Sequence, residues 1–282
     1  MTQKLNTQET MLKRFIPVND LGVSFGYGLF ETLRLYESIP FLLEPHLDRL
    51  IKSSRTLLFL NMPGKEQLKQ SLLAYIKEKG LRDQALRLSV TFGNQADEAE
   101  GIEPVPRVFI THRPIAYGPS DYEKGITAAI SAYRKNPYSP IVQHKTFNQL
   151  ENILAQRPGK DQRVKECILL NTSGYIAEGS KSNLFFVRDG RVYTPSIDCG
   201  LLPGITRKQV IDLLIRQGVR VLQGKYRIEE MQDCDECFCS NSLMEVIPIT
   251  KIDGQWVGSG HPGQFSRLAL SLYRQSVQKY KV

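Results

Sequence analysis

Three residue groups in this 282-residue chain have the chemistry to hold one class of small ligand. Lys145 supplies an amine just before a segment with helical spacing, and Glu178 supplies a carboxylate between predicted strands. Gly204 precedes a predicted helix, and the start of a helix binds phosphate through its backbone N–H groups and its dipole. An amine, a carboxylate and a phosphate site suit an aldehyde cofactor with a basic ring nitrogen, which is pyridoxal 5′-phosphate (PLP).

Each of these residues, taken alone, has a commoner explanation. A lysine beside a helix start is usually a solvated side chain, and a carboxylate in a turn is usually exposed. A nucleophilic lysine needs a lowered pKa, which burial or a nearby cation supplies. A carboxylate at Glu178 would keep the ring nitrogen protonated, and a protonated ring withdraws electrons from the carbon that bears the amine. The hypothesis therefore depends on the combination.

Several further residues are candidates for the phosphate site. Ile205 and Thr206 open the predicted helix, and Asn241 and Ser242 lie in a polar run that could donate hydrogen bonds. Arg49, on a predicted amphipathic helix, could make a charge-assisted contact with a phosphate. The sequence gives His144 no necessary role, although it adjoins the lysine.

Composition narrows the class of ligand and the location. The formal charge is +8, but the basic residues are scattered without a block of five or more, so we expect no nucleic-acid partner. A small anionic substrate fits this balance better. No stretch of about 18 apolar residues exists, so no membrane span is expected. The first six residues lack an apolar core, which predicts no secretory signal and a cytoplasmic protein.

The five cysteines do not predict a metal site. Cys234, Cys237 and Cys239 cluster, but Cys237 and Cys239 alternate with other residues in a strand-like run. No further Cys or His pair lies nearby to complete a tetrahedral site. We therefore expect no metal and reduced thiols, as in cytosolic proteins.

The first third of the chain predicts strands with helices packed on them. Apolar and polar residues alternate over 84–92, which indicates a half-buried strand. Helical spacing occurs over 47–58 and 68–76, and Gly80 is a suitable C′ residue for the second helix. This pattern predicts an α+β arrangement in which helices cover a sheet or barrel-like sheet.

Proline and glycine residues between 111 and 122 indicate a connection between domains. We predict a smaller N-terminal α/β domain over 1–114 and a linker over 115–122. A larger C-terminal domain over 123–282 would then carry Lys145.

The second region also alternates strands with helices. A helix is predicted over 146–156, and Asp189-Gly190 predicts a hairpin turn. Pro248 cannot donate to a sheet ladder, so the run around it predicts an edge strand or a bend. The other predicted strands cover 126–133, 167–170, 183–187 and 191–193, and the other predicted helices cover 205–216 and 264–280.

The order and spacing of these motifs resemble the class IV, or fold type IV, PLP-dependent enzymes. This family includes branched-chain aminotransferases, D-amino-acid aminotransferases and 4-amino-4-deoxychorismate lyases. The resemblance covers most of the chain. The blocks that carry it are 24–32 (SFGYGLFET), 46–50 (HLDRL), 145–152 (KTFNQLEN), 178–185 (EGSKSNLF), 201–207 (LLPGITR) and 241–248 (NSLMEVIP).

The resemblance implies a role for each matching residue. Lys145 would be the Schiff-base lysine and the proton shuttle, and Glu178 the partner of the ring nitrogen. The family fold implies two α/β domains and, usually, a homodimer in which the partner subunit helps to close the active site. The residues expected around the cofactor phosphate are Arg49, Ile205, Thr206, Asn241 and Ser242.

Within the family, the motifs favour the lyases. Branched-chain enzymes usually carry a tyrosine five residues after the lysine, where this chain has Leu150. D-amino-acid enzymes carry an arginine and a histidine after the strand matching 84–92, and neither is present here. The usual glycine-aspartate-glycine is Gly26-Tyr27-Gly28 in this chain. The resemblance therefore predicts 4-amino-4-deoxychorismate lyase, which releases pyruvate and 4-aminobenzoate in folate biosynthesis, with a class IV aminotransferase as the alternative.

Overall fold

The computed structural model of the protein describes residues 16–94, 103–156 and 164–281. The first six residues, on which the prediction of no secretory signal depends, lie outside this described part. The chain forms two compact units, which are called unit 1 and unit 2. Unit 1 comprises the described residues of Met1–Ile115 with His144–Asn148, and unit 2 those of Ala116–Gln143 and Gln149–Val282.

Lys145 belongs by its contacts to unit 1, although it follows the predicted linker in the sequence. The segment His144–Asn148, called the lysine segment, is hydrogen-bonded through its main chain to the first strand of unit 1, which explains why it belongs to this unit. The N–H of Phe30 donates to the carbonyl of Lys145 at 2.9 Å, and the N–H of Phe147 donates to the carbonyl of Gly28 at 2.9 Å. Chain order places this residue with the C-terminal region, and the predicted domain limits stay a prediction.

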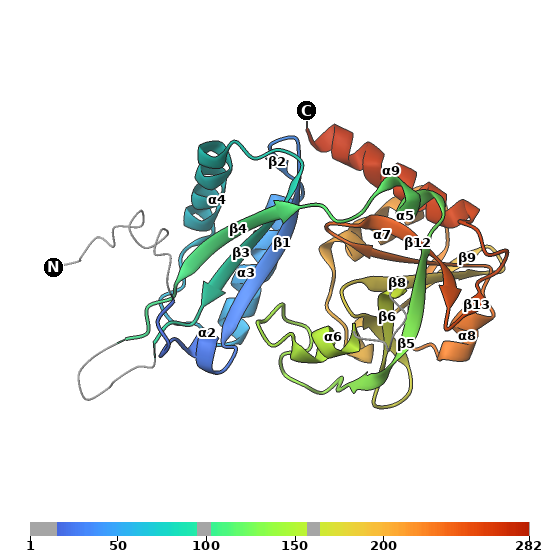
Figure 1. Cartoon of the computed structure of the whole chain (residues 1–282), viewed down its shortest axis with the longest axis horizontal. Coiled ribbons are helices and arrows are strands. Elements are labelled where there is room, and N and C mark those ends of the chain that lie inside the picture. The colour runs from blue at the N-terminus through green and yellow to red at the C-terminus, as the bar shows by residue number, and fades with distance from the viewer. Residues whose placement is uncertain (1–15, 95–102, 157–163, 282) are drawn as a thin grey trace. The chain divides into compact units, whose positions relative to one another are not determined.

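Unit 1 is an antiparallel sheet of four strands in the order β2-β1-β3-β4, with helices α3 and α4 packed together on one face (Figure 1). The strands are β1 (Gly28–Tyr36), β2 (Ile39–Pro40), β3 (Gln84–Thr91) and β4 (Val108–Pro114). The helices are α2 (Leu21–Ser24), α3 (Leu43–Thr56) and α4 (Lys65–Lys79).

The apolar positions predicted for unit 1 are confirmed in its core, but β3 is buried on both faces and not half-buried, because Ser89 and Thr91 are also 0% exposed. Leu86 and Leu88 of β3 are fully buried, as are Leu47 of α3 and Leu68 of α4. Burying a leucine side chain contributes about 1.5–3 kcal/mol, so this single apolar layer holds the two helices on the sheet. Helix α4 ends at Gly80 with a left-handed φ of 57°, as its C′ position predicts.

Unit 2 is built on a sheet of nine strands in the order β10-β9-β8-β11-β12-β5-β6-β7, with β13 paired to β12. The strands are β5 (Ile126–Lys135), β6 (Val164–Asn171), β7 (Ile176–Gly179), β8 (Asn183–Arg188), β9 (Arg191–Pro195), β10 (Val221–Gly224), β11 (Glu236–Asn241), β12 (Glu245–Ile252) and β13 (Gln255–Trp256). The helices are α5 (Pro119–Glu123), α6 (Leu150–Ala155), η1 (Ile197–Cys199), α7 (Ile205–Arg216), α8 (Ile228–Gln232) and α9 (Gln264–Tyr280).

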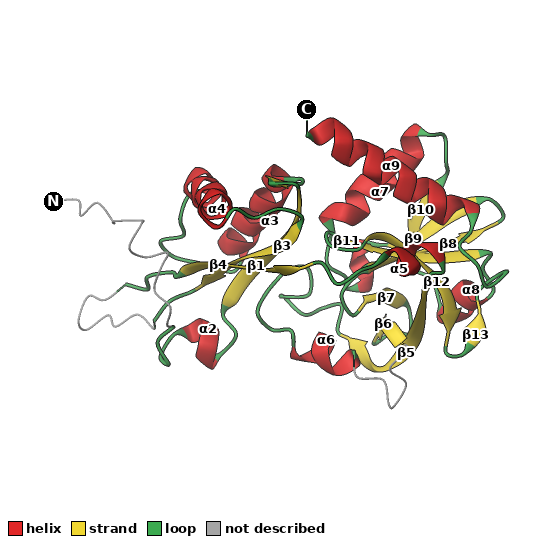
Figure 2. Ribbon diagram, turned by 45° about the horizontal axis from the view of Figure 1, so that its top comes forward, coloured by secondary structure: helices red, strands yellow, loops and turns green. Residues whose placement is uncertain are grey.

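The sheet of unit 2 curls into a half-barrel, because its edge strand β7 also contacts β8 and β9 near the other end of the strand order. Helices α7 and α9 cross on one face of this sheet and pack against β11 and β12 (Figure 2). The turn at Asp189-Gly190 joins β8 to β9 with both φ angles positive, as the hairpin signal predicts.

The predicted helix over 146–156 is wrong in its first half. Only Leu150–Ala155 is helical, because Thr146 pairs with Leu29 of β1 and Phe147 packs beside the same strand. The apolar Phe147 therefore packs in unit 1 and not on the apolar face of the helix, where its spacing predicts it.

The prediction that the run around Pro248 is an edge strand or a bend is also wrong. Strand β12 is central, with β11 on one side and β5 on the other. Pro248 is tolerated because the ladder to β5 begins only at Ile249, which pairs with Ile126 at the start of β5. Pro248, which has no N–H, thus stands one position before the first residue of β12 that pairs with β5.

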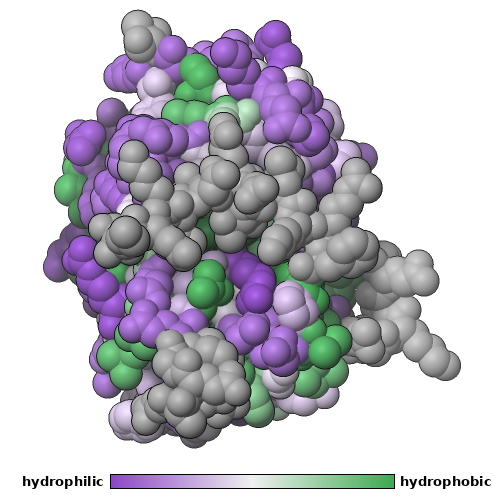
Figure 3. Space-filling view, turned by 90° about the vertical axis from the view of Figure 1, so that its left-hand side faces the viewer, coloured by the Kyte–Doolittle hydropathy of each residue, from purple (hydrophilic) through white to green (hydrophobic). Residues whose placement is uncertain are grey.

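The face of the molecule drawn in Figure 3 is mostly hydrophilic between the grey atoms, with apolar side chains in small groups. This agrees with the scattered charge of the sequence. Across the described residues, no helix has both the length and the apolar character that crossing a membrane requires.

Candidate active site

Lys145 is fixed through its main chain beside β1. In addition to the backbone bonds described above, its Nζ atom lies 4.5 Å from the centre of the Phe30 ring. A cation over an aromatic face is attracted by the ring quadrupole. The amine therefore has a defined place on unit 1 that does not depend on a helix.

Close backbone approach explains the glycines of Gly26-Tyr27-Gly28. A Cβ atom on Gly28 would come within 2.5 Å of the Phe147 ring, so any larger residue would displace the lysine segment. Gly26 has a left-handed φ of 67°, and its carbonyl accepts a hydrogen bond from Asn148 Nδ2 at 3.1 Å. This motif therefore positions the segment that follows Lys145.

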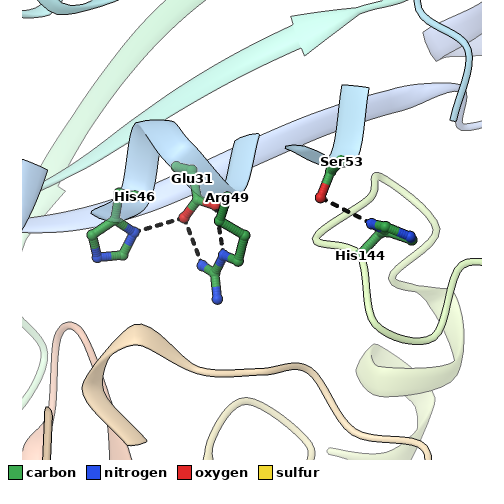
Figure 4. A network of polar contacts seen from close by, with 5 residues as sticks. All are labelled: Glu31, His46, Arg49, Ser53 and His144. Carbon is green, nitrogen blue, oxygen red and sulfur yellow. Dashed lines mark hydrogen bonds and ion pairs between the residues drawn. The ribbon is translucent and has the colours of Figure 1, made fainter. Parts of the chain in front are cut away.

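Arg49 lies in a buried network that the sequence did not reveal (Figure 4). Its Nε atom donates to Oε1 of Glu31 at 2.8 Å, and Nη2 donates to Oε2 at 2.6 Å. Nδ1 of His46 is 2.7 Å from the same Oε2. The side chains of Glu31 and His46 are only 1% and 2% exposed, so this carboxylate is satisfied entirely by the protein.

Electrostatics settle the protonation of this network. Burial by itself would raise the pKa of Glu31, but the Arg49 charge and the His46 hydrogen bond outweigh it and hold the pKa at about 2. Burial lowers the pKa of His46 most strongly, and the positive charges of Arg49 and Lys145 add to this, so together they outweigh the Glu31 carboxylate, which raises the pKa. His46 is therefore neutral, and its Nδ1 carries the hydrogen because a carboxylate only accepts.

We expect Glu31→Gln to flatten the acid dependence of stability. The ordinary pKa of the Glu31 carboxyl is 4.5, against about 2 in the folded protein. The unfolded chain therefore binds this proton first, and the stabilisation is complete above pH 4.5 and lost as the pH falls toward about 2. The difference corresponds to about 3 kcal/mol.

Urea unfolding of both proteins between about pH 6 and about pH 3.5 checks this expectation. The variant should start less stable and lose less free energy of unfolding over that range. Parallel losses in the two proteins would show that Glu31 does not titrate as described.

His144 connects the lysine segment to helix α3. Its Nδ1 atom is 2.9 Å from Oγ of Ser53, a buried residue on α3 (Figure 4). Burial lowers the pKa of His144, and the charge of Lys52 acts in the same direction. The sequence alone assigns this histidine no role, whereas in the structure its hydrogen bond to Ser53 helps to hold Lys145 in place.

Glu178 lies on β7 of unit 2, where both of its oxygens are engaged. Oε1 forms a buried ion pair with Nζ of Lys135, the last residue of β5. Oε2 accepts a hydrogen bond from the N–H of Leu202 at 3.0 Å. Lys135 is a residue that the sequence analysis missed, and its ion pair fixes the position of the carboxylate within the half-barrel.

The turn after Glu178 is anchored by a second buried carboxylate. Glu166, on β6, accepts hydrogen bonds from the hydroxyls of Ser180 and Ser182, each at 2.6 Å. Asn152 Nδ2 donates to the carbonyl of Ser180 at 2.8 Å. The polar residues of the block 178–185 thus fix the backbone that carries Glu178, which accounts for their spacing.

Helix α7 begins at Ile205, as predicted, after the N-cap residue Gly204. Gly204 provides no side-chain cap for the first amides of the helix. A Cβ atom on Gly204 would come within 2.0 Å of Asn183 Oδ1, so glycine is required for close packing here. Thr206 is buried in the first turn. A helix start of this form suits a phosphate.

Arg207 adds a buried positive charge to the same helical turn. Its guanidinium donates to the carbonyl of Pro195 at 2.8 Å and to Oε1 of Gln223 at 2.9 Å. Burial lowers the pKa of Arg207 to about 10. The sequence analysis did not single out this residue, because arginine near a helix start is usually exposed.

Asn241 and Ser242 lie in the turn between β11 and β12. The Oδ1 atom of Asn241 accepts from the N–H groups of Leu243 and Met244, each at 2.8 Å, and Nδ2 donates to the carbonyl of Lys181 at 2.9 Å. These bonds give Asn241 a structural role in the turn. Its part in a phosphate site stays a prediction.

The cysteines show no sign of metal chemistry. All five are buried free thiols, and burial raises the pKa of Cys234 to about 12 and holds that of Cys237 well above its ordinary value. In the part of the chain that the structure describes, no group of three or more His, Cys, Asp and Glu side chains could hold a metal ion.

The donor set fits pyridoxal phosphate. Unit 1 contains the amine of Lys145 and the guanidinium of Arg49, and unit 2 contains the carboxylate of Glu178 and the start of α7. An aldehyde, a ring nitrogen and a phosphate require these four kinds of group. All four are present among the described residues, and their roles at the cofactor stay a prediction.

Comparison with known proteins gives the family. A family model described as amino-transferase class IV matches residues 28–252. Aminodeoxychorismate lyase of Bacillus subtilis is 32% identical over 265 residues, which cover 92% of this chain and 88% of that protein. A putative branched-chain-amino-acid aminotransferase of Methanocaldococcus jannaschii is 31% identical over 259 residues, covering 89% and 88%. The chain spans 47% of the length of two branched-chain-amino-acid aminotransferase-like proteins of Arabidopsis thaliana, with 30% identity.

Solved structures agree on the fold. The 4-amino-4-deoxychorismate lyase of Pseudomonas aeruginosa matches with a TM-score of 0.84 and 27% identity, covering 95% of this chain and 98% of that one. The branched-chain amino acid aminotransferase of Escherichia coli matches with a TM-score of 0.82 and 27% identity, covering 91% and 86%. The family match over residues 28–252 and the donor set lead to one conclusion: the chain belongs to the class IV aminotransferase family and is a PLP-dependent enzyme of fold type IV.

Proposed function

We propose that the protein is a 4-amino-4-deoxychorismate lyase, which forms pyruvate and 4-aminobenzoate for folate biosynthesis. The observation that carries the choice is the absence of two aminotransferase hallmarks at described positions. Leu150 stands where branched-chain enzymes have a tyrosine, and Gly93 and Asn94 follow the strand over 84–92 where D-amino-acid enzymes place an arginine and a histidine. Phe92, just before them, stacks on Tyr27 with ring centres 4.3 Å apart. The Bacillus subtilis and Pseudomonas aeruginosa lyases, which match nearly end to end, support the same choice.

Lys145 has two tasks in this proposal. With the cofactor bound, Lys145 would hold the cofactor aldehyde and, once the substrate amine takes its place, would remove the proton from the ring carbon that bears the substrate nitrogen. The C–O bond to the enolpyruvyl group would then break, which makes the ring aromatic, and the leaving enolpyruvate would take up a proton to become pyruvate. General acid–base help of this kind contributes about 10²–10⁴-fold. The bound cofactor supplies the electron sink that makes this carbon acidic.

The remaining predicted residues hold the cofactor in this proposal. Glu178 pairs with the ring nitrogen, and its ion pair with Lys135 holds it in place. Arg49, the start of α7 at Ile205 and Thr206, and the turn of Asn241 and Ser242 receive the phosphate. The orientation of Arg49 by Glu31 and the uncapped start of α7 support these roles.

Arg87 supports an anionic substrate. This half-buried side chain lies on β3, with its guanidinium carbon 3.6 Å from the centre of the Phe30 ring that Lys145 also faces. Its Nε donates to Oγ of Ser89 at 3.2 Å, and no carboxylate pairs with it among the described residues. Burial and the charge of Arg113 lower its pKa. Such a cation suits a substrate carboxylate.

We expect Arg87→Gln to raise KM by about tenfold to a hundredfold, because a charged hydrogen bond contributes about 1.5–3 kcal/mol. The value of kcat should change much less. Steady-state assays of the variant check this, with Arg113→Gln on the exposed end of β4 as the matched control. An unchanged KM would remove Arg87 from the substrate site.

Incubation with aminodeoxychorismate and an assay of 4-aminobenzoate test the proposed function. The native protein should form 4-aminobenzoate and pyruvate in equal amounts. A yield no higher than that of Lys145→Ala would overturn the proposal.

An amino-acid aminotransferase is the alternative, and the similarity to the Methanocaldococcus jannaschii and Escherichia coli proteins favours it. It would use the same cofactor residues. The discriminating measurement is a single turnover with an amino acid and no second substrate. One equivalent of 2-oxo acid per bound cofactor would indicate the aminotransferase.

The proposal also includes a homodimer in the cytoplasm. Sedimentation equilibrium should give twice the chain mass of 32.0 kDa. A monomer with full activity would contradict the expected contribution of a second subunit to the site.

A further inference from the structure

Glu31 is a buried carboxylate that is not among the predicted site residues. It lies in the middle of β1, paired in register with Leu88 of β3, and is 1% exposed. Its two oxygens receive three hydrogen bonds, two from Arg49 and one from His46 (Figure 4). Burying a carboxylate in an apolar core costs free energy unless its charge is compensated by partners such as these.

The contacts of Glu31 fix one edge of the Arg49 guanidinium. Nε and Nη2 lie on the same side of the planar group, and each bonds a different oxygen of the carboxylate. A planar fork held at two points cannot rotate about its last bonds. Two of its five N–H groups therefore bond Glu31, and these bonds fix the direction in which the rest of the guanidinium points.

The same strand also places Lys145. Phe30, which precedes Glu31, bonds the Lys145 carbonyl through its N–H and meets Lys145 Nζ with its ring. Consecutive residues of β1 therefore hold the amine and the guanidinium. Any shift of β1 would move both groups together.

We propose that Glu31 is a positioning residue that orients Arg49 for the cofactor phosphate, an inference that rests on the phosphate-binding role given to Arg49 above. His46, as a neutral donor, holds the carboxylate from its other side. Glu31 itself touches neither cofactor nor substrate in this account.

Charge and orientation predict opposite results for the loss of Glu31. Its negative charge partly cancels Arg49, so charge alone would make a Glu31→Gln variant bind a phosphate dianion more tightly. Orientation predicts weaker binding, because the guanidinium would lose its two-point support. The sign of the change therefore separates the two effects.

The experiment compares PLP with pyridoxal, which lacks the phosphate, in binding to cofactor-free protein. The dissociation constant of pyridoxal divided by that of PLP measures how much the phosphate contributes to binding, without any turnover. This quotient is called the binding ratio. Arg49→Met should lower this ratio by about tenfold or more, the loss of one charge-assisted contact. Glu31→Gln should lower it by about fivefold or more, and the double variant should match Arg49→Met within about twofold, because effects through a shared partner are not additive.

Asp20→Asn is the matched control. Asp20 is also a fully buried carboxylate of unit 1 with an arginine partner, Arg107, at 2.8 Å. Its loss should destabilise the unit and leave the binding ratio unchanged. If Glu31→Gln does not fold, Glu31→Asp keeps the charge, withdraws it by one methylene, and should still lower the ratio by about threefold.

The outcomes separate this inference from the proposal beneath it. A native ratio in Arg49→Met would mean that Arg49 does not bind the phosphate, so the failure would lie in the proposed function. A lowered ratio in Arg49→Met with a native or raised ratio in Glu31→Gln or Glu31→Asp would overturn the positioning role of Glu31 alone.

Discussion

Lys145→Ala should abolish formation of 4-aminobenzoate, with a loss of about 10⁴-fold or more, because one amine serves as both nucleophile and proton shuttle. The protein should still fold. The hydrogen bond from Phe30 to residue 145 uses the main-chain carbonyl, which alanine retains. Near-native thermal unfolding together with lost turnover would place the effect in the chemistry.

Two variants act as controls for this result. Lys145→Arg keeps a positive charge near the Phe30 ring but provides no primary amine, so it should be as inactive as the alanine variant. Lys52→Ala removes an exposed lysine from α3 of the same unit and should keep native activity. Turnover by Lys145→Ala within about tenfold of the native rate would exclude the lysine as the base.

Glu178→Leu should have the second largest effect, on both stability and activity. It leaves the ammonium of Lys135, whose side chain is 8% exposed, without its carboxylate. Breaking a buried ion pair from one side costs about 3–5 kcal/mol. The ring nitrogen would also lose its partner, so activity should fall even in protein that remains folded.

The double variant Lys135→Met with Glu178→Leu separates these two losses. An apolar pair of similar volume should restore much of the free energy of unfolding, because replacing a whole buried ion pair is often neutral. Activity should stay low, since the ring-nitrogen partner is still missing. Denaturant unfolding and steady-state assays on the three variants check this, and recovered activity in the double variant would remove Glu178 from the cofactor site.

The parts of the fold that could be predicted are those set by local periodicity. The alternation of apolar residues over 84–92 gave β3, and the leucines of α3 and α4 gave the helices that cover it. Gly80 gave the end of α4. In each case the pattern within one element determines which side is buried, so no knowledge of distant contacts was needed.

The wrong predictions concern contacts between distant segments. Phe147 has helical spacing with Leu150, but its backbone pairs with Gly28, more than a hundred positions earlier. Pro248 lies in a central strand because the neighbouring strand begins one residue later, and register cannot be read from one strand alone.

The site was predictable only as a set of residue types. Lys145, Glu178 and the start of α7 could be predicted because they lie in motifs whose order and spacing resemble those of the family. Glu31 and Lys135 could not, because each supports a residue on another element and has no local signal of its own. A charged residue at an apolar position of a strand, as at Glu31 between Leu29 and Leu33 on one face of β1, is the one hint that the sequence contains.

The most direct test is to reduce the PLP-loaded protein with borohydride, digest it and locate the cofactor by peptide mass mapping. Reduction fixes the bond between the cofactor aldehyde and the protein amine. The account predicts a single modified peptide that contains Lys145. Modification at any other lysine, or none at all, would contradict it.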